Sequence, residues 1–127
     1  MCTGWTGLIM QMNKHPDMQV LDNSCVGLDG RDDKLLQWIS DSGIAALIAD
    51  NYAVEYWPPK PREGKRAMIP LHEHCLFKLG IPLGEIWWLQ DLAVWLRKNQ
   101  RSRFLLTAPP LRLPGAIGSP ATPVATV

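Results

Sequence analysis

The sequence predicts an α/β fold, and three observations carry that prediction. A helix-forming stretch that starts at Asp32 leads through Gly43 into an uninterrupted apolar run, residues 44–49. A helix followed directly by a continuous apolar strand is typical of a sheet covered on both faces. Two further helical patterns, at 71–79 and 89–98, are separated by Gly and Pro, and 46% of the residues are hydrophobic. That content is ordinary for a folded domain and argues against disorder.

The N-terminal segments carry weaker patterns. Residues 3–12 are apolar and short, with two glycines, and we expect a strand that opens into a turn or short helix. Residues 13–30 are rich in Asp, Asn, Gly and Pro, which predicts a loop.

The next helix has clear signals at both ends. Asp32 or Asp33 can cap its start, and Gly43 stands where a helix usually ends. Its apolar residues, at 35, 36, 38 and 39, form one stripe. The predicted strand 44–49 then ends in Asp50 and Asn51, at the carboxyl end of a buried strand, where α/β proteins commonly build sites.

Punctuation by Pro and Gly divides the rest of the chain. Residues 57–66 form a basic, proline-rich loop, which we expect to be a solvated connection. Gly80 ends the helix 71–79, and charges in the first and last turns of 89–98 suit a helix dipole. Residues 104–108 predict a strand, and residues 109–127 a loop-like C-terminal segment.

Charge and cysteine content narrow the class of partner. The 13 basic and 12 acidic residues give a net charge of +1, so neither nucleic acid nor a membrane is expected as a partner. No apolar run approaches the ~20 residues of a membrane span. Three cysteines without a C-x-x-C spacing favour reduced thiols and a cytoplasmic location. A small molecule or a protein surface remains the expected partner.

His72 is the first candidate for chemistry. On a helix it shares a face with Cys75, Leu76 and Leu79, so it points inward at the helix start after a loop. Such a position suits a metal ligand or a catalytic base. From periodicity alone, a hydrogen-bonded core histidine is the more common outcome.

Three carboxylates are the other candidates. Glu85 lies in an apolar stretch, where it is either buried beside a cation or exposed at the start of the next helix. Asp50 and Glu55 follow the buried strand and could orient a histidine ligand as outer-shell groups. The residues favour the simpler alternative, in which Asp50 bonds its own turn and Glu55 is a surface charge. Neither a serine nucleophile nor a reactive Cys75 has the context it needs.

Four pieces of the chain, in order, resemble the C-terminal half of the cyclase family, which includes bacterial kynurenine formamidases. They are Thr3-Gly4-Trp5, LLQWISDSGIAALIADNYAVE, LHEHCLFKLGIPLGE and PLRLPGAIGSP. The resemblance implies an α/β fold with a mixed sheet and flanking helices, here as a truncated domain spanning 1–127. It also implies a divalent metal, zinc or manganese, and hydrolysis of amide-like or cyclic carbonyl substrates, with a homo-oligomer as a possible assembly.

The same resemblance implies that His72 and Glu85 are metal ligands, because they match the family's His-then-Glu pattern. The family's histidine-rich motif, of the form H-x-G-T-H-x-D-x-P-x-H, is not in this sequence. The chain then holds no catalytic residue of its own, and we expect weak or no metal binding and no activity from it alone. The alternative function is a non-catalytic interaction or binding domain, or one half of a split protein.

Overall fold

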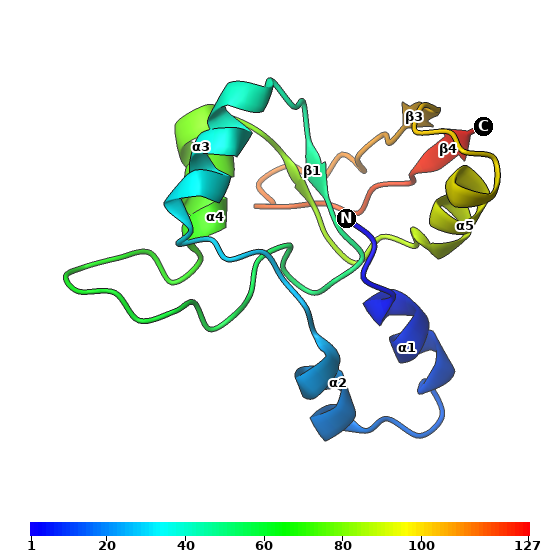
Figure 1. The fold of residues 1–127 in the computed structure, drawn as a ribbon, viewed down its shortest axis with the longest axis horizontal. Helices are drawn as coiled ribbons and strands as arrows, with labels where there is room; N and C mark the ends of the chain where they lie inside the picture. Colours follow the sequence, from blue (N-terminus) through cyan, green and yellow to red (C-terminus); the bar gives the residue numbers. More distant parts are fainter. The chain divides into compact units, whose positions relative to one another are not determined.

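The computed structural model describes residues 1–127, which fold as two units, Met1–Gln90 and Asp91–Val127 (Figure 1). Helices and short strands occur together, which confirms the α/β prediction. Its strands form two separate two-stranded sheets, one parallel and one antiparallel. The helices are α1 (Trp5–Gln11), α2 (Met18–Ser24), α3 (Asp33–Ser42), α4 (Pro70–His72), the π-helix η1 (Glu73–Leu79) and α5 (Gln90–Lys98). The strands are β1 (Leu47–Ile48), β2 (Leu83–Gly84), β3 (Leu105–Thr107) and β4 (Val124–Thr126).

Helix α3 begins and ends where its sequence predicts. The Asp32 side chain accepts hydrogen bonds from the backbone N–H groups of Lys34 and Leu35 at 2.8 and 3.1 Å. Gly43 follows the last turn with a φ of 67°, a conformation that costs glycine little. Ile39 is the buried residue of the helix.

The parallel pair β1–β2 is shorter than the predicted strand 44–49. Leu47 pairs with Leu83 and Ile48 with Gly84, and single hydrogen bonds extend the contact as far as Trp87 and Asn51. The two strand residues of β1 are half-buried, and residues 45 and 46 are exposed. The expectation of a strand covered on both faces was therefore wrong, because a two-stranded sheet offers too little surface for two covering layers.

Helices α4 and η1 form one continuous segment that widens after its first turn. Leu71 and Cys75 are fully buried, whereas Leu76 and Leu79 are 49% and 39% exposed. The predicted inward face holds for Cys75 and is wrong for the two leucines. A π-helix forms i→i+5 hydrogen bonds, so residues spaced for an α-helical stripe no longer share one face.

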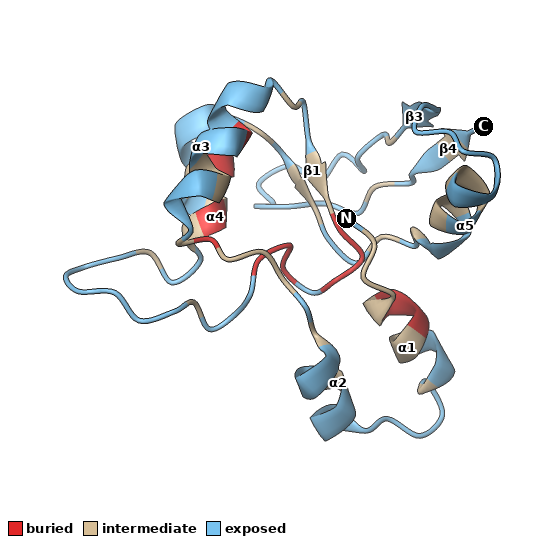
Figure 2. Ribbon diagram, in the orientation of Figure 1, coloured by how far each residue is buried: buried red, intermediate tan, exposed pale blue.

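The core of the first unit lies between α3, the α4–η1 segment and the chain after β1. Figure 2 shows the buried residues gathered on facing parts of α3 and α4 and along the segment that follows β1. The members of this cluster are Ile39, Ala49, Val54, Leu71 and Cys75. Leucines and isoleucines of α3, β1 and β2 pack against it, half-buried. Dispersion and the hydrophobic effect thus hold together the elements that carry His72 and Glu55.

Both N-terminal segments are more helical than predicted. Residues 3–12 contain helix α1 and no strand. The predicted loop 13–30 contains helix α2, whose start is capped by the Asp17 side chain accepting from Val20 N–H at 3.1 Å. The Asp17 cap is the signal that composition alone concealed.

The second unit holds a strand pair that the sequence predicted only in part. β3 lies inside the predicted strand 104–108, and β4 pairs with it in antiparallel register, Leu106 opposite Ala125. The prediction of 109–127 as a loop-like segment was therefore wrong at its end. Frequent Pro and Gly concealed the short strand after Pro123. None of the helices combines the length and the apolar character that crossing a bilayer requires.

Candidate metal centre

Glu55 is held in place by the turn that follows β1. The Asn51 side chain accepts from Val54 N–H at 2.9 Å and donates to the Val26 carbonyl at 2.7 Å. Val54 has a φ of 59°, which is uncommon for a β-branched residue. Glu55 forms a parallel bridge with Leu28, and its side chain is fully buried. The prediction that Glu55 is a surface charge was therefore wrong.

The buried carboxylate of Glu55 caps the start of helix α4. Leu71 N–H donates to Oε2 at 2.9 Å, and His72 N–H donates to Oε1 at 3.0 Å. The first N–H groups of a helix have no partner within the helix. A buried anion at that end satisfies them and in turn loses part of its desolvation cost.

The imidazole of His72 lies between two carboxylates. Its Nδ1 is 2.7 Å from Oε1 of Glu55, and its Nε2 is 2.9 Å from Oε1 of Glu85. The His72 side chain is 18% exposed and that of Glu85 36% exposed. The histidine is therefore oriented from the buried side and presents Nε2 toward the more open side.

This arrangement fixes the protonation of His72. The hydrogen bond to Glu55 raises its pKa most; burial opposes that effect, and the hydrogen bond to Glu85 adds to it. Because Glu55 offers an acceptor, the proton on Nδ1 stays there, and Nε2 is the nitrogen that exchanges its proton. With no metal between them, an imidazolium balances the two carboxylates.

Glu85 reaches the histidine because β2 runs parallel to β1. Glu85 directly follows β2, as the chain carrying Glu55 follows β1, and parallel neighbours bring their carboxyl ends to one edge. The next residue, Ile86, has a φ of 56° and donates its N–H to the Asn51 carbonyl at 3.0 Å. The two acidic residues of the site are thus positioned by one sheet edge.

Gly30 leaves the room that the Glu55 carboxylate needs. A Cβ built on Gly30 would meet Glu55 Oε2 at 2.4 Å and Leu71 N at 2.8 Å. Any side chain at this position would push the carboxylate away from helix α4. The sequence offered no sign of this requirement, because a glycine in a polar loop predicts only a turn.

Asp50 lies elsewhere, and its carboxylate does not reach a histidine. Thr3 N–H and Thr3 Oγ1 donate to its Oδ1 at 2.6 and 2.8 Å, and Gly4 N–H donates to Oδ2 at 2.7 Å. Thr6 Oγ1 donates to the Asp50 backbone carbonyl. Asp50 thus binds the N-terminal segment rather than its own turn or the imidazole, and both sequence-based interpretations of Asp50 were wrong.

The donor set at His72 and Glu85 fits a divalent metal in ligand type. Zinc and manganese accept imidazole nitrogen and carboxylate oxygen. Ligands of one zinc lie about 2.0–2.2 Å from it, so two of them are roughly 3 Å apart, close to the observed 2.9 Å. The Nδ1–carboxylate bond is the outer-shell contact that metal-binding histidines usually make. The set is two ligands large, since no group of three or more His, Cys, Asp or Glu side chains forms a candidate site.

The other reactive side chains nearby are already occupied. His74 Nε2 lies 3.1 Å from the Leu36 carbonyl and 3.0 Å from Ser40 Oγ on helix α3. Cys75 is fully buried; burial first, and the charge of Glu55 second, raise the pKa of its thiol. A thiol whose pKa is raised forms little nucleophilic thiolate.

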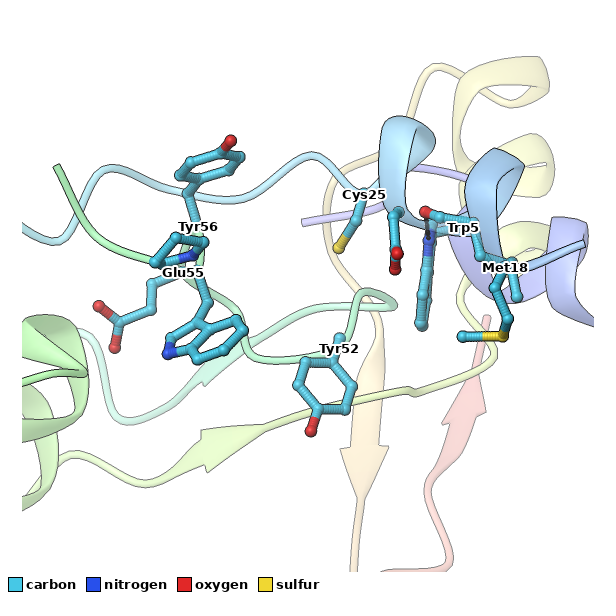
Figure 3. A pocket seen from close by; sticks show the side chains of 10 residues that line it. Trp5, Met18, Cys25, Tyr52, Glu55 and Tyr56 are labelled. Carbon is cyan, nitrogen blue, oxygen red and sulfur yellow. Dashed lines mark hydrogen bonds between the residues drawn. The ribbon is translucent and has the colours of Figure 1, made fainter.

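An apolar cavity of about 660 Å³ lies on the far side of Glu55. Figure 3 shows Trp5, Tyr52 and Tyr56 around it, with the carboxylate of Glu55 turned away from Trp5 and Tyr52. The rings of Trp5 and Tyr52 meet edge to face at 6.4 Å. Neither His72 nor Glu85 lines this cavity, so Glu55 separates it from the candidate ligands.

Comparison with known proteins relates this chain to a cyclase. A solved structure described as a novel cyclase is 37% identical to it, with a TM-score of 0.61. The match covers 75% of this chain and 29% of the cyclase, so the chain spans less than a third of that protein's length. No family model matches the sequence, and neither does any curated protein. The relation to a cyclase therefore holds in both sequence and fold.

Proposed function

We propose that this chain forms part of a metal-dependent hydrolase of the cyclase type, with His72 and Glu85 as two of the ligands of a divalent metal. The observation that carries the proposal is the imidazole held between Glu55 at 2.7 Å and Glu85 at 2.9 Å. A core histidine that serves packing alone has no need of a carboxylate on each nitrogen. The relation to a cyclase supports the same assignment.

Each of the three side chains has a distinct task in this proposal. Glu55 holds the proton on Nδ1, so that the lone pair of Nε2 is directed outward. His72 and Glu85 then place one neutral and one negative donor at the same point. A cation there supplies Lewis acidity toward a substrate carbonyl. The substrates we propose are amides or cyclic carbonyl compounds, with an aryl formamide as the first to assay.

The number of ligands limits what the isolated chain achieves. Mononuclear hydrolytic zinc sites usually have three protein ligands and one open position, whereas the proposed site has two side chains. We therefore expect weak binding of zinc or manganese, and no turnover, from this chain alone. Added ligands from another polypeptide would complete the site.

Metal binding tests the proposal directly. Equilibrium dialysis of zinc and manganese against the purified chain should give an affinity that His72→Ala lowers by at least about tenfold. His74→Ala is the matched control, because this neighbouring histidine contacts α3 instead. Equal affinities for wild type and His72→Ala would contradict the ligand assignment. Formamide or lactone hydrolysis by the chain alone would contradict the expected inactivity.

A second candidate function is a non-catalytic interaction domain, and the exposed side of η1 favours it. Phe77 is 86% exposed, beside Leu76 and Leu79 at 49% and 39%. Large apolar side chains grouped on one helix often mark a contact surface. A chain that forms a stable complex with a protein partner and keeps it after His72→Ala would favour this function over the metal site.

A further inference from the structure

A second, smaller cavity lies away from the candidate metal centre. It has a volume of about 260 Å³ and lies between α3, the chain at 62–67 and the α4–η1 segment. None of Glu55, His72 and Glu85 lines it. Four basic side chains do: Arg31, Arg62, Arg66 and Lys78. The basic loop that the sequence marked as a solvated connection therefore contributes to a concave, positively charged site.

Only half of this positive charge is neutralised. Arg62 pairs with Asp33 at 3.3 Å, and Lys78 pairs with Glu73 at 3.2 Å. Arg31 and Arg66 form no ion pair. Arg31 Nη2 donates to the Ala67 carbonyl at 3.1 Å, and Arg66 Nε donates to the Glu63 carbonyl at 3.2 Å. Two guanidinium groups at one cavity thus have neutral partners only.

Arg31 provides a second and independent sign of a ligand. Its Nε is buried and has no hydrogen-bond partner, and no other buried side-chain polar atom shares that condition. Native proteins rarely leave a buried donor unpaired, and such a donor commonly marks a place where an ion binds. The cost is greater for a charged donor than for a neutral one. An acceptor that carries negative charge would remove it.

We propose that this cavity binds a small phosphate-like oxyanion through Arg31 and Arg66. Two planar guanidinium groups offer paired N–H donors that match the spacing of phosphate oxygens. The volume is below the roughly 300–1,000 Å³ of pockets for drug-sized ligands, which favours inorganic phosphate or pyrophosphate over a nucleotide. Because Nε of Arg31 is screened from solvent, an anion that reaches it displaces part of the covering chain. The proposal does not depend on the metal site.

Calorimetric titration of the whole chain with sodium phosphate, pyrophosphate and malonate at constant ionic strength tests this site. Phosphate or pyrophosphate should bind at one saturable site, and the dicarboxylate more weakly. The exposed Arg66→Gln variant should bind at least about tenfold more weakly. Arg97→Gln on α5 removes the same charge outside the cavity and should bind as wild type does.

Three results would overturn the proposal. They are the lack of saturable phosphate binding, an equal loss of affinity in Arg66→Gln and Arg97→Gln, and tighter binding of malonate than of phosphate. Arg31→Lys keeps the charge but loses the planar fork, so it should also weaken binding. If that variant fails to fold, the phosphate-dependent rise in melting temperature, compared between wild type and Arg66→Gln, still decides the question.

Discussion

Asp50 and Glu55 are two buried carboxylates at the ends of one short segment after β1, and they do different work. Asp50 accepts hydrogen bonds from Thr3 and Gly4, so it fastens the N-terminal segment to the sheet edge. Glu55 accepts from the start of α4 and holds Nδ1 of His72. The comparison teaches that an acidic residue after a strand acquires its role from the donors that the fold brings to it.

The largest effect on stability should come from Asp50. Asp50→Ala removes the acceptor of three hydrogen bonds and leaves their donors unpaired. We expect the free energy of unfolding to fall by about 3 kcal/mol, measured by urea denaturation. Asp41→Ala, on the exposed side of α3, is the control and should change stability by less than about 0.5 kcal/mol. Similar losses in both variants would remove the special role of Asp50.

Glu55 should instead act on metal affinity. Glu55→Gln keeps the size of the side chain but withdraws the charge that polarises His72. We expect zinc or manganese affinity to fall by about 10- to 100-fold, measured by competition with a chromophoric chelator. Asp50→Asn, which also neutralises a buried carboxylate, should leave the affinity unchanged. A matching loss in both variants would mean that general charge, rather than orientation of the imidazole, sets the affinity.

The pH dependence of stability should separate the two sites by sign, beginning with Asp50. Burial alone would raise the pKa of Asp50, but the hydrogen bonds from Thr3 and Gly4 outweigh it and the net pKa is lowered. A carboxyl whose folded pKa lies below the unfolded one stabilises the fold above the unfolded pKa, about 3.9. That contribution is lost as the pH falls through the folded pKa. Asp50→Asn should therefore flatten the acid side of the stability profile.

His72 should give a smaller effect of opposite sign in the metal-free chain. The hydrogen bond to Glu55 raises its pKa most, against burial and with help from Glu85. The stabilisation is present below the unfolded pKa, about 6.5. It is lost as the pH rises through the raised folded pKa. Subtracting the profile of His72→Gln from that of wild type should show this decline, and a difference that grows with pH would contradict it.

The sequence predicted the fold best where local chemistry decides it. Helix α3 follows from the Asp32 cap, the apolar stripe and Gly43, all of which act within a few residues. Helix α2 was concealed because composition outweighed the single capping signal of Asp17. β4 was concealed because its pairing with β3 depends on residues far away in the chain. Strand pairing is a tertiary property, so local patterns carry little of it.

The candidate site was predictable in its residues and much less so in its arrangement. His72 and Glu85 stood out through helix position, apolar context and resemblance. That they approach to 2.9 Å depends on the parallel pairing of β1 with β2. The role of Glu55 was undervalued, because nothing in the letters around it shows that its side chain is fully buried. The π-helical widening at η1 also altered which side chains accompany His72 inward.

The two-residue pairing of β1 with β2 makes the spacing of the site depend on chain length. A slip of one residue would carry Glu85 about 3.3 Å along the strand and turn its side chain to the other face. Insertions or deletions between Gly80 and Glu85 should therefore separate the carboxylate from His72. Insertions near Gly64, at the exposed tip of the long connection, should leave that spacing intact. Natural variation in length is thus expected to concentrate in the connection and to avoid the five residues before Glu85.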